Sequence, residues 1–373
     1  MKGLTQFSRI FVGVLFIISG LIKANDTIGF SYKLEEYFEL FNWPFFIAYA
    51  ESLAMIICIF EIMCGVVLLL GSYARLNAWL LLLMIIFFTW LTGYSAITHK
   101  VTDCGCFGDA VKLKPFESFL KDLVLLVFIL IIFFGVKHIK PLFNSTIQGI
   151  LLFVALFVST AFTLYTYMFL PVKDFLPYKV GNNIREKMAM PPGAQADEYE
   201  LVFIYERDGK RFEFNANNLP ADLDKYTFIE RKDKLLKEGY KPPIHDFKVY
   251  DVYGTEYTDS LLNGNEYKLV LVQTHIEEGR QGTESTLRDL AGNWINQAHL
   301  PFWALTATSK DQIEAYRHEH QLPFHYYTMD ATPLKSIVRS NPGLVLMKGS
   351  TVVKKWSAYN LPSYEIVKKY MVQ

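Results

Sequence analysis

The chain has 373 residues and a formal net charge of zero, because 37 basic side chains balance 37 acidic ones. This balance excludes the basic footprint that a nucleic-acid-binding protein carries. Hydrophobic residues make up 51% of the chain, which is high for a soluble protein. They dominate before about residue 170, and most of the charge follows that point. The composition therefore predicts a membrane part followed by a soluble part, with room for two or three domains.

Five apolar runs in the first half are long enough, at about 20 residues, to cross a bilayer as helices. The first, RIFVGVLFIISGLIK, follows a short basic start as a signal peptide would, but no small-residue cleavage site comes after it. We therefore predict a retained helix, and a loop over about 24–44. The runs cover approximately residues 8–24, 45–71, 77–98, 117–137 and 147–170.

Basic residues in short loops predict the orientation in the membrane. They gather at the N-terminus, between the second and third runs, and between the fourth and fifth, which share one side if all five runs span. On the opposite side, the loop at 24–44 is acidic. The loop near residues 100–114 contains three lysines, which weakens the charge difference between the two sides. We predict a bacterial inner-membrane protein with a cytoplasmic N-terminus and a periplasmic C-terminal part. The basic residues are Lys2, Arg9, Arg75, Lys137, His138 and Lys140.

Three acidic residues lie within the apolar runs: Glu51, Glu61 and Asp122. Charges at membrane depth are costly, so they usually face the bundle interior and often mark function. These residues are either proton-handling groups or members of structural ion pairs, with Arg9 and Lys23 as candidate partners for the two glutamates. Asp122, near a helix start, can also simply favour the helix dipole.

All four cysteines lie in the apolar half, which excludes a disulfide framework for the soluble half. Cys58 and Cys64 fall inside an apolar run, and we interpret them as packing residues. Cys104 and Cys106 stand one glycine apart in VTDCGCFGDAVKLKPF, just before the fourth run. On the exported side of a bacterial membrane a disulfide between them can persist.

The Cys-Gly-Cys pair has the features of a catalytic redox pair. Thiol–disulfide exchange needs an accessible thiolate with a second thiol nearby, and Gly105 permits the tight backbone. The following helix N-terminus favours a thiolate, and a ring closed over one residue is strained and easily reduced. Two alternatives stay open. The pair is a passive loop clip, or it binds a metal with His99, Asp103 or Asp109, although this spacing is a weak zinc signal and we predict no metal.

The soluble half changes pattern along its length. Residues 172–243 form a β-rich linker segment, with a hairpin that turns at Asp208-Gly209. Residues 244–373 begin with a second hairpin at Tyr253-Gly254 and continue in the order β-α-β-α-β-α-β-β-α. This order predicts a mixed sheet with helices packed on it.

Residues 1–140 resemble the DoxX-like/MauE family of bacterial four-helix membrane proteins. The matching stretches are ISGLIK, DTIGFSYKLEEYF, AESLAMIICIFEIMCGVVLLLG and DCGCFGD. The MauE branch is linked to the maturation of a periplasmic enzyme rich in disulfides, which implies disulfide chemistry for Cys104 and Cys106. Residues 141–171 then supply a fifth transmembrane helix. The layout also resembles that of vitamin K epoxide reductase homologues, where a cysteine pair near a helix end passes electrons to a quinone.

Residues 244–373 resemble a periplasmic thioredoxin-like domain of the TlpA type, through SNPGLVLMKGSTVVKKW and the strand–helix order. The resemblance implies a cis peptide before Pro342 and a partner-binding groove at Asn341 and Pro342. The family's Cys-x-x-Cys should lie near 274–282, but the sequence there is THIEEGRQG and no cysteine follows Cys106. Thioredoxin chemistry in this domain is therefore ruled out, because a thiolate is the nucleophile.

We therefore predict a multi-domain membrane protein, an all-α transmembrane bundle followed by an exported α/β thioredoxin-like domain. One hypothesis is a membrane thiol–disulfide oxidoreductase in which Cys104 and Cys106 exchange electrons with exported thiols. A membrane quinone is then the candidate cofactor, with Glu51, Glu61 or Asp122 handling protons. The other hypothesis is a non-enzymatic assembly subunit that grips an exported or membrane protein beside Pro342. In both, the lipid bilayer is a partner and nucleic acid is not.

Overall fold

The computed structural model describes residues 2–98, 100–101, 105, 107–111, 113–195, 198–215, 218–220, 222–237 and 239–371. Contacts within the chain divide it into two units, residues 1–182 with 248–373, and residues 183–247. The first unit contains a helix bundle and a C-terminal α/β domain. Each unit is described by itself.

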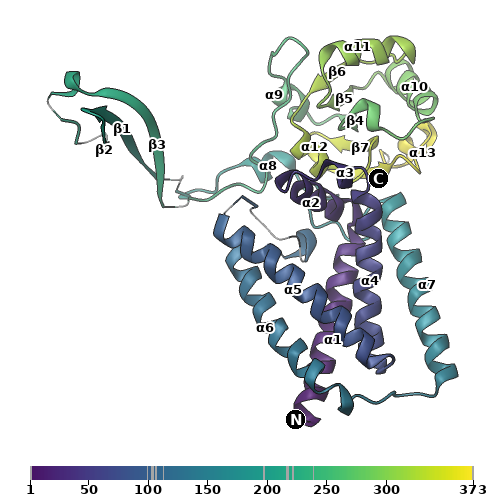
Figure 1. Ribbon diagram of the computed structural model, residues 1–373. Helices are drawn as coiled ribbons and strands as arrows, with labels where there is room; N and C mark the ends of the chain where they lie inside the picture. The colour runs from purple at the N-terminus through teal and green to yellow at the C-terminus, as the bar shows by residue number, and fades with distance from the viewer. Residues whose placement is uncertain are drawn as a thin grey trace. The chain divides into compact units, whose positions relative to one another are not determined.

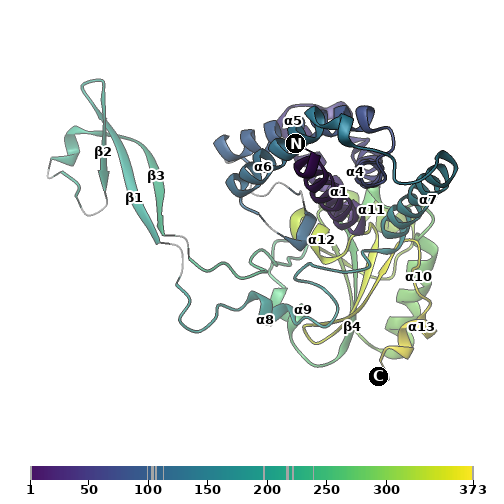
Figure 2. The same cartoon turned by 90° about the horizontal axis from the view of Figure 1, so that it is seen from below.

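Five long helices lie side by side as a bundle (Figure 1) and are seen end-on in Figure 2. Among the described residues, four helices are long and apolar enough to cross a membrane, which confirms a membrane protein: α1 (Lys2–Asn25), α4 (Ala50–Leu70), α5 (Ala74–Thr98) and α7 (Ser145–Phe169). The fifth is α6 (Pro115–Phe134), whose 20 residues carry Glu117, Lys121 and Asp122 near the N-terminal end. It packs through Leu125, Ile129 and Ile132 into the same core as α1 and α5.

Glycines allow α1 and α4 to approach closely. A Cβ atom added to Gly13 would lie 2.6 Å from Leu69 Cδ2, and one added to Gly65 would lie 2.7 Å from the Gly13 carbonyl oxygen. Small residues at such crossings are typical of helices that associate in a membrane. Aliphatic side chains such as Val12 and Leu81 fill the rest of the bundle core.

The predicted loop over 24–44 is wrong, because most of it forms α2 (Thr27–Leu40). The Asp26 side chain caps this helix by accepting a hydrogen bond from the Gly29 backbone N–H at 2.8 Å. A short helix, α3 (Pro44–Ile47), follows, and residues 48–49 lie between it and α4. The sequence did not predict α2 as a helix, because its mixed polar and apolar composition differs from that of the long apolar runs on either side. The end of the bundle where α2 lies is called the α2 end below.

The second unit contains a three-stranded antiparallel sheet in the order β2-β1-β3. Its elements are α8 (Ile184–Met188), β1 (Glu198–Arg207), β2 (Lys210–Asn215), the short helix η3 (Leu223–Lys225) and β3 (Thr227–Lys237). The predicted hairpin is confirmed, and both turn residues, Asp208 and Gly209, have positive φ angles as a tight hairpin turn requires. The pattern did not predict β3.

The C-terminal domain contains a five-stranded mixed sheet in the order β6-β5-β4-β7-β8. Strand β4 pairs in parallel with β5 and antiparallel with β7, as the predicted order requires. This is the strand order predicted for a thioredoxin-like domain, and the peptide between Asn341 and Pro342 is cis, as the resemblance implied. The predicted hairpin at Tyr253-Gly254 is reduced to one bridge between Tyr250 and Glu256. The elements are α9 (Thr258–Leu262), β4 (Tyr267–Gln273), α10 (Glu284–Asn293), β5 (Phe302–Thr306), α11 (Lys310–Glu319), β6 (Tyr326–Thr328), α12 (Ala331–Ile337), β7 (Gly343–Lys348), β8 (Thr351–Ser357) and α13 (Tyr364–Lys369).

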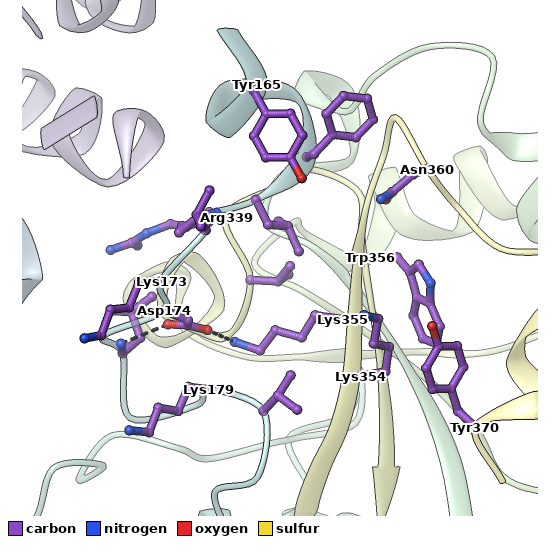
Figure 3. A pocket seen from close by; sticks show the side chains of 17 residues that line it. Tyr165, Lys173, Asp174, Lys179, Arg339, Lys354, Lys355, Trp356, Asn360 and Tyr370 are labelled. Atoms are coloured by element: carbon purple, nitrogen blue, oxygen red, sulfur yellow. Dashed lines mark hydrogen bonds and ion pairs between the residues drawn. The ribbon is translucent and has the colours of Figure 1, made fainter. Parts of the chain in front are cut away.

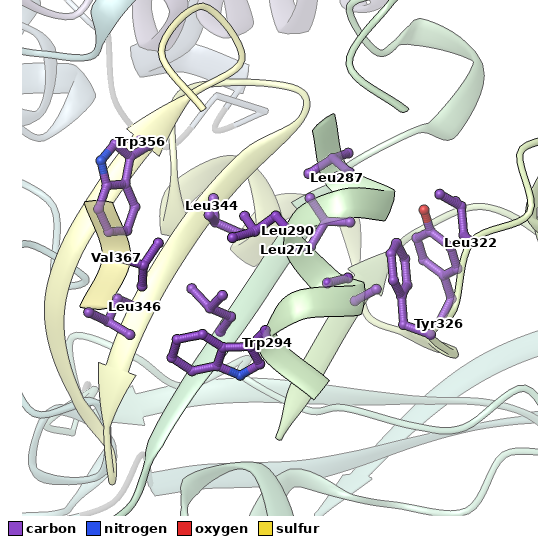
Figure 4. Close-up of a cluster of buried hydrophobic side chains, with 14 of the residues drawn as sticks. Leu271, Leu287, Leu290, Trp294, Leu322, Tyr326, Leu344, Leu346, Trp356 and Val367 are labelled. Carbon is purple, nitrogen blue, oxygen red and sulfur yellow. The ribbon is translucent and has the colours of Figure 1, made fainter. Parts of the chain in front are cut away.

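The core of this domain lies between the sheet and the helices α10, α11 and α13 (Figure 4). Trp294 sits at its centre with no exposed surface, and its indole N–H donates to the Pro301 carbonyl oxygen at 3.0 Å. Leu271 and Leu346 from the central strands belong to the same cluster. The indole therefore combines a large buried area with a satisfied polar group.

Replacing Trp294 with alanine should lower the free energy of unfolding of the C-terminal domain by about 3–5 kcal/mol, because a large cavity replaces the indole. The matched variant Trp294→Phe should lose less, since most of the apolar volume remains. Urea unfolding of the full chain in detergent, followed by pulse proteolysis, measures both. Equal stability of Trp294→Ala and the parent would contradict this account of the core.

Candidate functional site

Cys104 and Cys106 lie outside the described residues, as do His99 and Asp103 of the metal alternative. Their described neighbours lie at the α2 end. Val101 is buried in a cluster with Tyr37 and Leu91. Gly105 has a φ angle of +65°, and a Cβ atom there would lie 3.1 Å from Lys33 Cγ. Within the described part of the chain, no group of three His, Cys, Asp or Glu side chains is placed to hold a metal.

Arg339 connects the C-terminal domain to the α2 end of the bundle. Its Nε donates to Asp26 Oδ2 at 2.9 Å, and its Nη2 donates to Asp109 Oδ2 at 2.7 Å. Only 7% of the Arg339 side chain is exposed. Burial alone would lower the pKa of Arg339, but Asp26 and Asp109 outweigh it and hold the pKa above its ordinary value. One guanidinium therefore joins the start of α2, the loop that follows Cys106, and the segment before Pro342.

A second, more exposed ion pair lies beside the first. Lys335 of α12 donates to Glu35 of α2 at 3.0 Å, and its ammonium lies 4.2 Å from the centre of the Tyr32 ring. Burial raises the pKa of Glu35, and Lys335 opposes that shift. Both partners are about a quarter exposed, so this pair stabilises the contact less than the Arg339 pairs do.

A cavity of about 460 Å³ lies at this contact between α2, the 99–114 loop and α12. Gly105 and Gly108 contribute to its wall. Its charged lining comes from α2, the loop and α12: Asp26, Lys33, Glu35, Glu36, Glu39, Asp109, Lys335 and Arg339. The size and the charged lining of the cavity suit a polar chain segment or a small polar molecule.

Asn341 and Pro342 lie on the segment that follows Arg339. The Asn341 side-chain amide donates to the His275 carbonyl oxygen at 2.8 Å, and its Oδ1 is buried without a hydrogen-bond partner. The Arg280 backbone N–H donates to the Asn341 carbonyl oxygen at 2.9 Å. The stretch THIEEGRQG therefore packs against the cis-proline segment, and Pro342 itself is buried. Partner binding at these two residues stays a prediction.

Glu61 forms a buried ion pair with Lys23. The Lys23 ammonium lies 2.6 Å from Glu61 Oε2, and Ser19 donates to Glu61 Oε1 at 3.1 Å. This is one of the two partners that the sequence offered for the glutamates. The other, Arg9, instead donates to the backbone carbonyl oxygens of Leu68 and Leu69, at 2.9 and 2.6 Å.

Asp122 lies close to this pair, whereas Glu51 does not. Asp122 forms an ion pair with Lys121, whose Nζ lies 2.9 Å from Oδ1, and accepts a hydrogen bond from Thr92 Oγ1 at 2.9 Å. A small cavity of about 30 Å³ is lined by both ion pairs and by Phe107, which follows Cys106. Glu51 instead accepts a hydrogen bond from the Tyr167 hydroxyl at 2.7 Å and is exposed. The structure thus brings Glu61 and Asp122 together beneath the loop and leaves Glu51 apart.

Sequence reasoning missed an aromatic cavity of about 270 Å³ between α2, α4 and α5. Lys23 lies at its buried side, with Nζ 5.6 Å from the centre of the Phe30 ring and 5.5 Å from that of Phe88. Its other side is formed by exposed aromatic rings, among them Phe87 and Trp90. The sequence signal that could have indicated this cavity was the high content of Phe, Tyr and Trp in α2 and in the second half of α5.

Comparison with known proteins finds two family models and a solved structure that resemble parts of the chain. Residues 1–135 match the model of the family described as "Methylamine utilisation protein MauE", and residues 199–238 match a domain of unknown function (DUF8463). The solved structure of a thiol peroxidase from Chromobacterium violaceum is similar at 16% identity and a TM-score of 0.28, over 35% of this chain and 83% of that one. Among curated proteins the comparison finds no match.

Replacing Arg339 with glutamine should loosen the contact between the C-terminal domain and the α2 end, because Asp26 and Asp109 lose the buried cation that pairs with both. Hydrogen exchange in the first turn of α2 and in residues 107–111 should accelerate by at least about tenfold. The neighbouring Lys335→Gln variant is the matched control. It should change exchange by less than about fivefold, because its pair is partly exposed. Equal effects of the two substitutions would contradict the assigned role of Arg339.

Proposed function

We propose that this membrane protein is a thiol–disulfide oxidoreductase whose reacting groups are Cys104 and Cys106. The observation that supports this most is the Arg339 contact, which holds the loop beside Cys106 against a thioredoxin-like domain that has no cysteine of its own. The MauE match over residues 1–135 includes this loop and supports the proposal. A cavity at the loop gives a polypeptide substrate room to reach it.

The proposed reaction starts from the Cys104–Cys106 disulfide. A thiolate of an exported protein attacks one sulfur, forms a mixed disulfide and releases the other cysteine as a thiol. A second thiolate of the substrate then attacks the mixed disulfide, so that the substrate is oxidised and both cysteines are reduced. Two electrons and two protons must then leave the pair before the next turnover.

The thioredoxin-like domain is proposed to guide substrates rather than to react with them. Its Arg339 and Lys335 form one side of the cleft, and acidic side chains of α2 form the other. A substrate segment that enters must satisfy both kinds of charge, which favours polar or zwitterionic sequences. In this way the domain retains a thioredoxin-like recognition role while the membrane loop carries the thiols.

A membrane quinone is the proposed acceptor for the two electrons and two protons. The aromatic cavity between α2, α4 and α5 supports this, because flat apolar rings suit a quinone ring and the exposed aromatics face the membrane side. Lys23 lines this cavity and is paired with Glu61, and both line the smaller cavity that reaches Phe107. Glu61 and Asp122 are the proposed proton-handling groups between the loop and the quinone.

The proposed orientation puts the α2 end on the exported side of a bacterial inner membrane. The basic residues Lys2, Arg75, Lys137 and Lys140 belong to the opposite end, where α1 begins and where the turns α4–α5 and α6–α7 lie (Figure 1). The positive-inside rule assigns that end to the cytoplasm. The loop of Cys104 and Cys106 then faces an oxidising compartment.

The second candidate function is a non-enzymatic assembly subunit. The observation that favours it is that the C-terminal domain keeps its cis-proline segment, Asn341 and Pro342, although no cysteine lies in that domain. In this case the bundle is an anchor and the Cys-Gly-Cys pair is a loop clip.

Trapping the reaction tests the oxidoreductase. A Cys106→Ser variant expressed in the native host should accumulate mixed disulfides on Cys104, because no second thiol resolves them, and mass spectrometry identifies the partners. The Cys104→Ala/Cys106→Ala variant should shift exported proteins toward free thiols. The control variant Cys58→Ala/Cys64→Ala should leave thiol states unchanged, since both of those cysteines are buried in the bundle.

A membrane-impermeant maleimide applied to reduced spheroplasts tests the orientation at the same time. It should label the Cys104/Cys106 loop and neither cysteine of α4. If the Cys104→Ala/Cys106→Ala variant fully complements a deletion and thiol states in exported proteins are unchanged, the oxidoreductase proposal is wrong. The assembly subunit is then the remaining candidate function.

Filling the aromatic cavity tests the electron acceptor separately. The variant Leu34→Trp should slow repeated turnover with a short-chain quinone by about tenfold, because overpacking weakens ring binding. The first, stoichiometric oxidation of substrate thiols should remain, since it needs only the preformed disulfide. Leu83→Trp, on an exposed part of α5, is the control and should turn over normally. Unchanged turnover in Leu34→Trp would exclude this cavity as the quinone site.

A further inference from the structure

A larger cavity, of about 810 Å³, lies where the chain leaves α7 (Figure 3). The C-terminal end of α7 forms one wall with Tyr165 and Phe169, and residues 170–180 form a second. Strand β8 closes it with Lys354, Lys355 and Trp356. The oxidoreductase proposed above uses none of these side chains.

The cavity is strongly basic. Lys173, Lys179, Lys354, Lys355 and Arg339 line it against a single carboxylate, Asp174. Asp174 accepts a hydrogen bond from Lys355 at 2.8 Å, and Arg339 is paired with carboxylates at the α2 end.

Three lysines therefore remain to set the charge of the cavity. Within the described part of the chain, no carboxylate forms an ion pair with Lys173, Lys179 or Lys354. Lys173 Nζ lies 5.3 Å from the centre of the Phe175 ring, and Lys354 Nζ lies 5.4 Å from that of Tyr370. Three such ammonium groups around one hollow create a site for an anion.

The position of the cavity points to the membrane as the source of that anion. It adjoins the last turns of a helix that is apolar and long enough to span, and Tyr165 there is half exposed. Aromatic rings at the end of a membrane helix commonly lie at headgroup depth. Below them, α7 exposes a continuous apolar surface that includes Phe153, Phe157 and Leu164.

We propose that this cavity binds the headgroup of an anionic glycerophospholipid. The lysines that line the cavity attract its phosphate, and its acyl chains follow the exposed surface of α7 in the leaflet that the C-terminal end of the helix reaches. Apolar wall residues such as Phe169, Val172 and Trp356 suit the glycerol and upper acyl region, whereas a free inorganic anion would gain nothing from them. The volume lies within the range of small-molecule sites.

The bound lipid would bridge two parts of the first unit. Lys173 and Lys179 belong to the segment after α7, and Lys354 belongs to β8. Protein contacts already join these parts, since Ser357 Oγ donates to the Met168 carbonyl oxygen at 2.7 Å and the Val352 N–H donates to the Asn182 carbonyl oxygen at 3.0 Å. A phosphate among the three lysines would strengthen that junction and relieve their mutual repulsion.

The test compares the full chain in nanodiscs of phosphatidylglycerol and of phosphatidylcholine. Lysine acylation read by mass spectrometry should show Lys173, Lys179 and Lys354 protected in phosphatidylglycerol. Native mass spectrometry should show retained phosphatidylglycerol on the parent chain. The variant Lys173→Gln/Lys179→Gln/Lys354→Gln should bind it more weakly by about fivefold for each lysine removed.

Two controls make the result specific. The variant Lys248→Gln/Lys310→Gln/Lys368→Gln removes the same charge from exposed positions elsewhere and should retain the lipid. Inorganic phosphate at millimolar concentration, added to phosphatidylcholine nanodiscs, should not protect the three lysines. Protection by phosphate alone would make the cavity a site for a soluble anion and overturn the lipid proposal, as would equal lipid retention by the two triple variants.

Discussion

The contact of Arg339 with Asp26 and Asp109 is the interaction on which the arrangement at the α2 end depends. A buried guanidinium is tolerated only when carboxylates compensate the loss of water, and here two do so from segments far apart in the chain. Asp26 also caps α2, so the same carboxylate fixes a helix start and a domain contact. Removing either carboxylate would leave a buried charge incompletely paired, which makes the contact sensitive to single substitutions.

Buried ion pairs also organise the bundle beneath that contact. Lys23 is paired with Glu61 and at the same time lines the aromatic cavity, so one ammonium connects a carboxylate to an apolar binding space. Thr92 and Lys121 hold Asp122 in a similar way. Charges this deep in an apolar bundle are costly, and the two ion pairs line one small cavity together with Phe107, which is why proton handling is proposed for Glu61 and Asp122.

Much of the fold could be predicted from the sequence, because its signals are local. Long apolar runs predicted the bundle helices, and alternating strands and helices predicted the mixed sheet and its β7–β8 hairpin. The helix α2 could not be predicted this way, since its amphipathic residues resemble a loop between longer runs. Arg339 and Asp26 are 313 residues apart in the chain, so no local sequence pattern could predict that they pair. The sequence reduced the candidate partners of Glu61 to two basic residues, but it did not show which of them forms the ion pair.

The division of chemistry between the two parts of the first unit follows from where the thiols are. The thioredoxin-like domain retains the cis-proline segment but has a cysteine-free stretch, His275 to Arg280, packed against it. All four cysteines lie in the membrane domain, which is why the proposed thiol exchange is assigned there, to Cys104 and Cys106. Arg339 lies three residues before Pro342, so the segment that would position a substrate over thioredoxin cysteines is instead attached beside the membrane loop. In the proposed function, the cysteine-free domain controls access to the thiols of the membrane loop through this attachment.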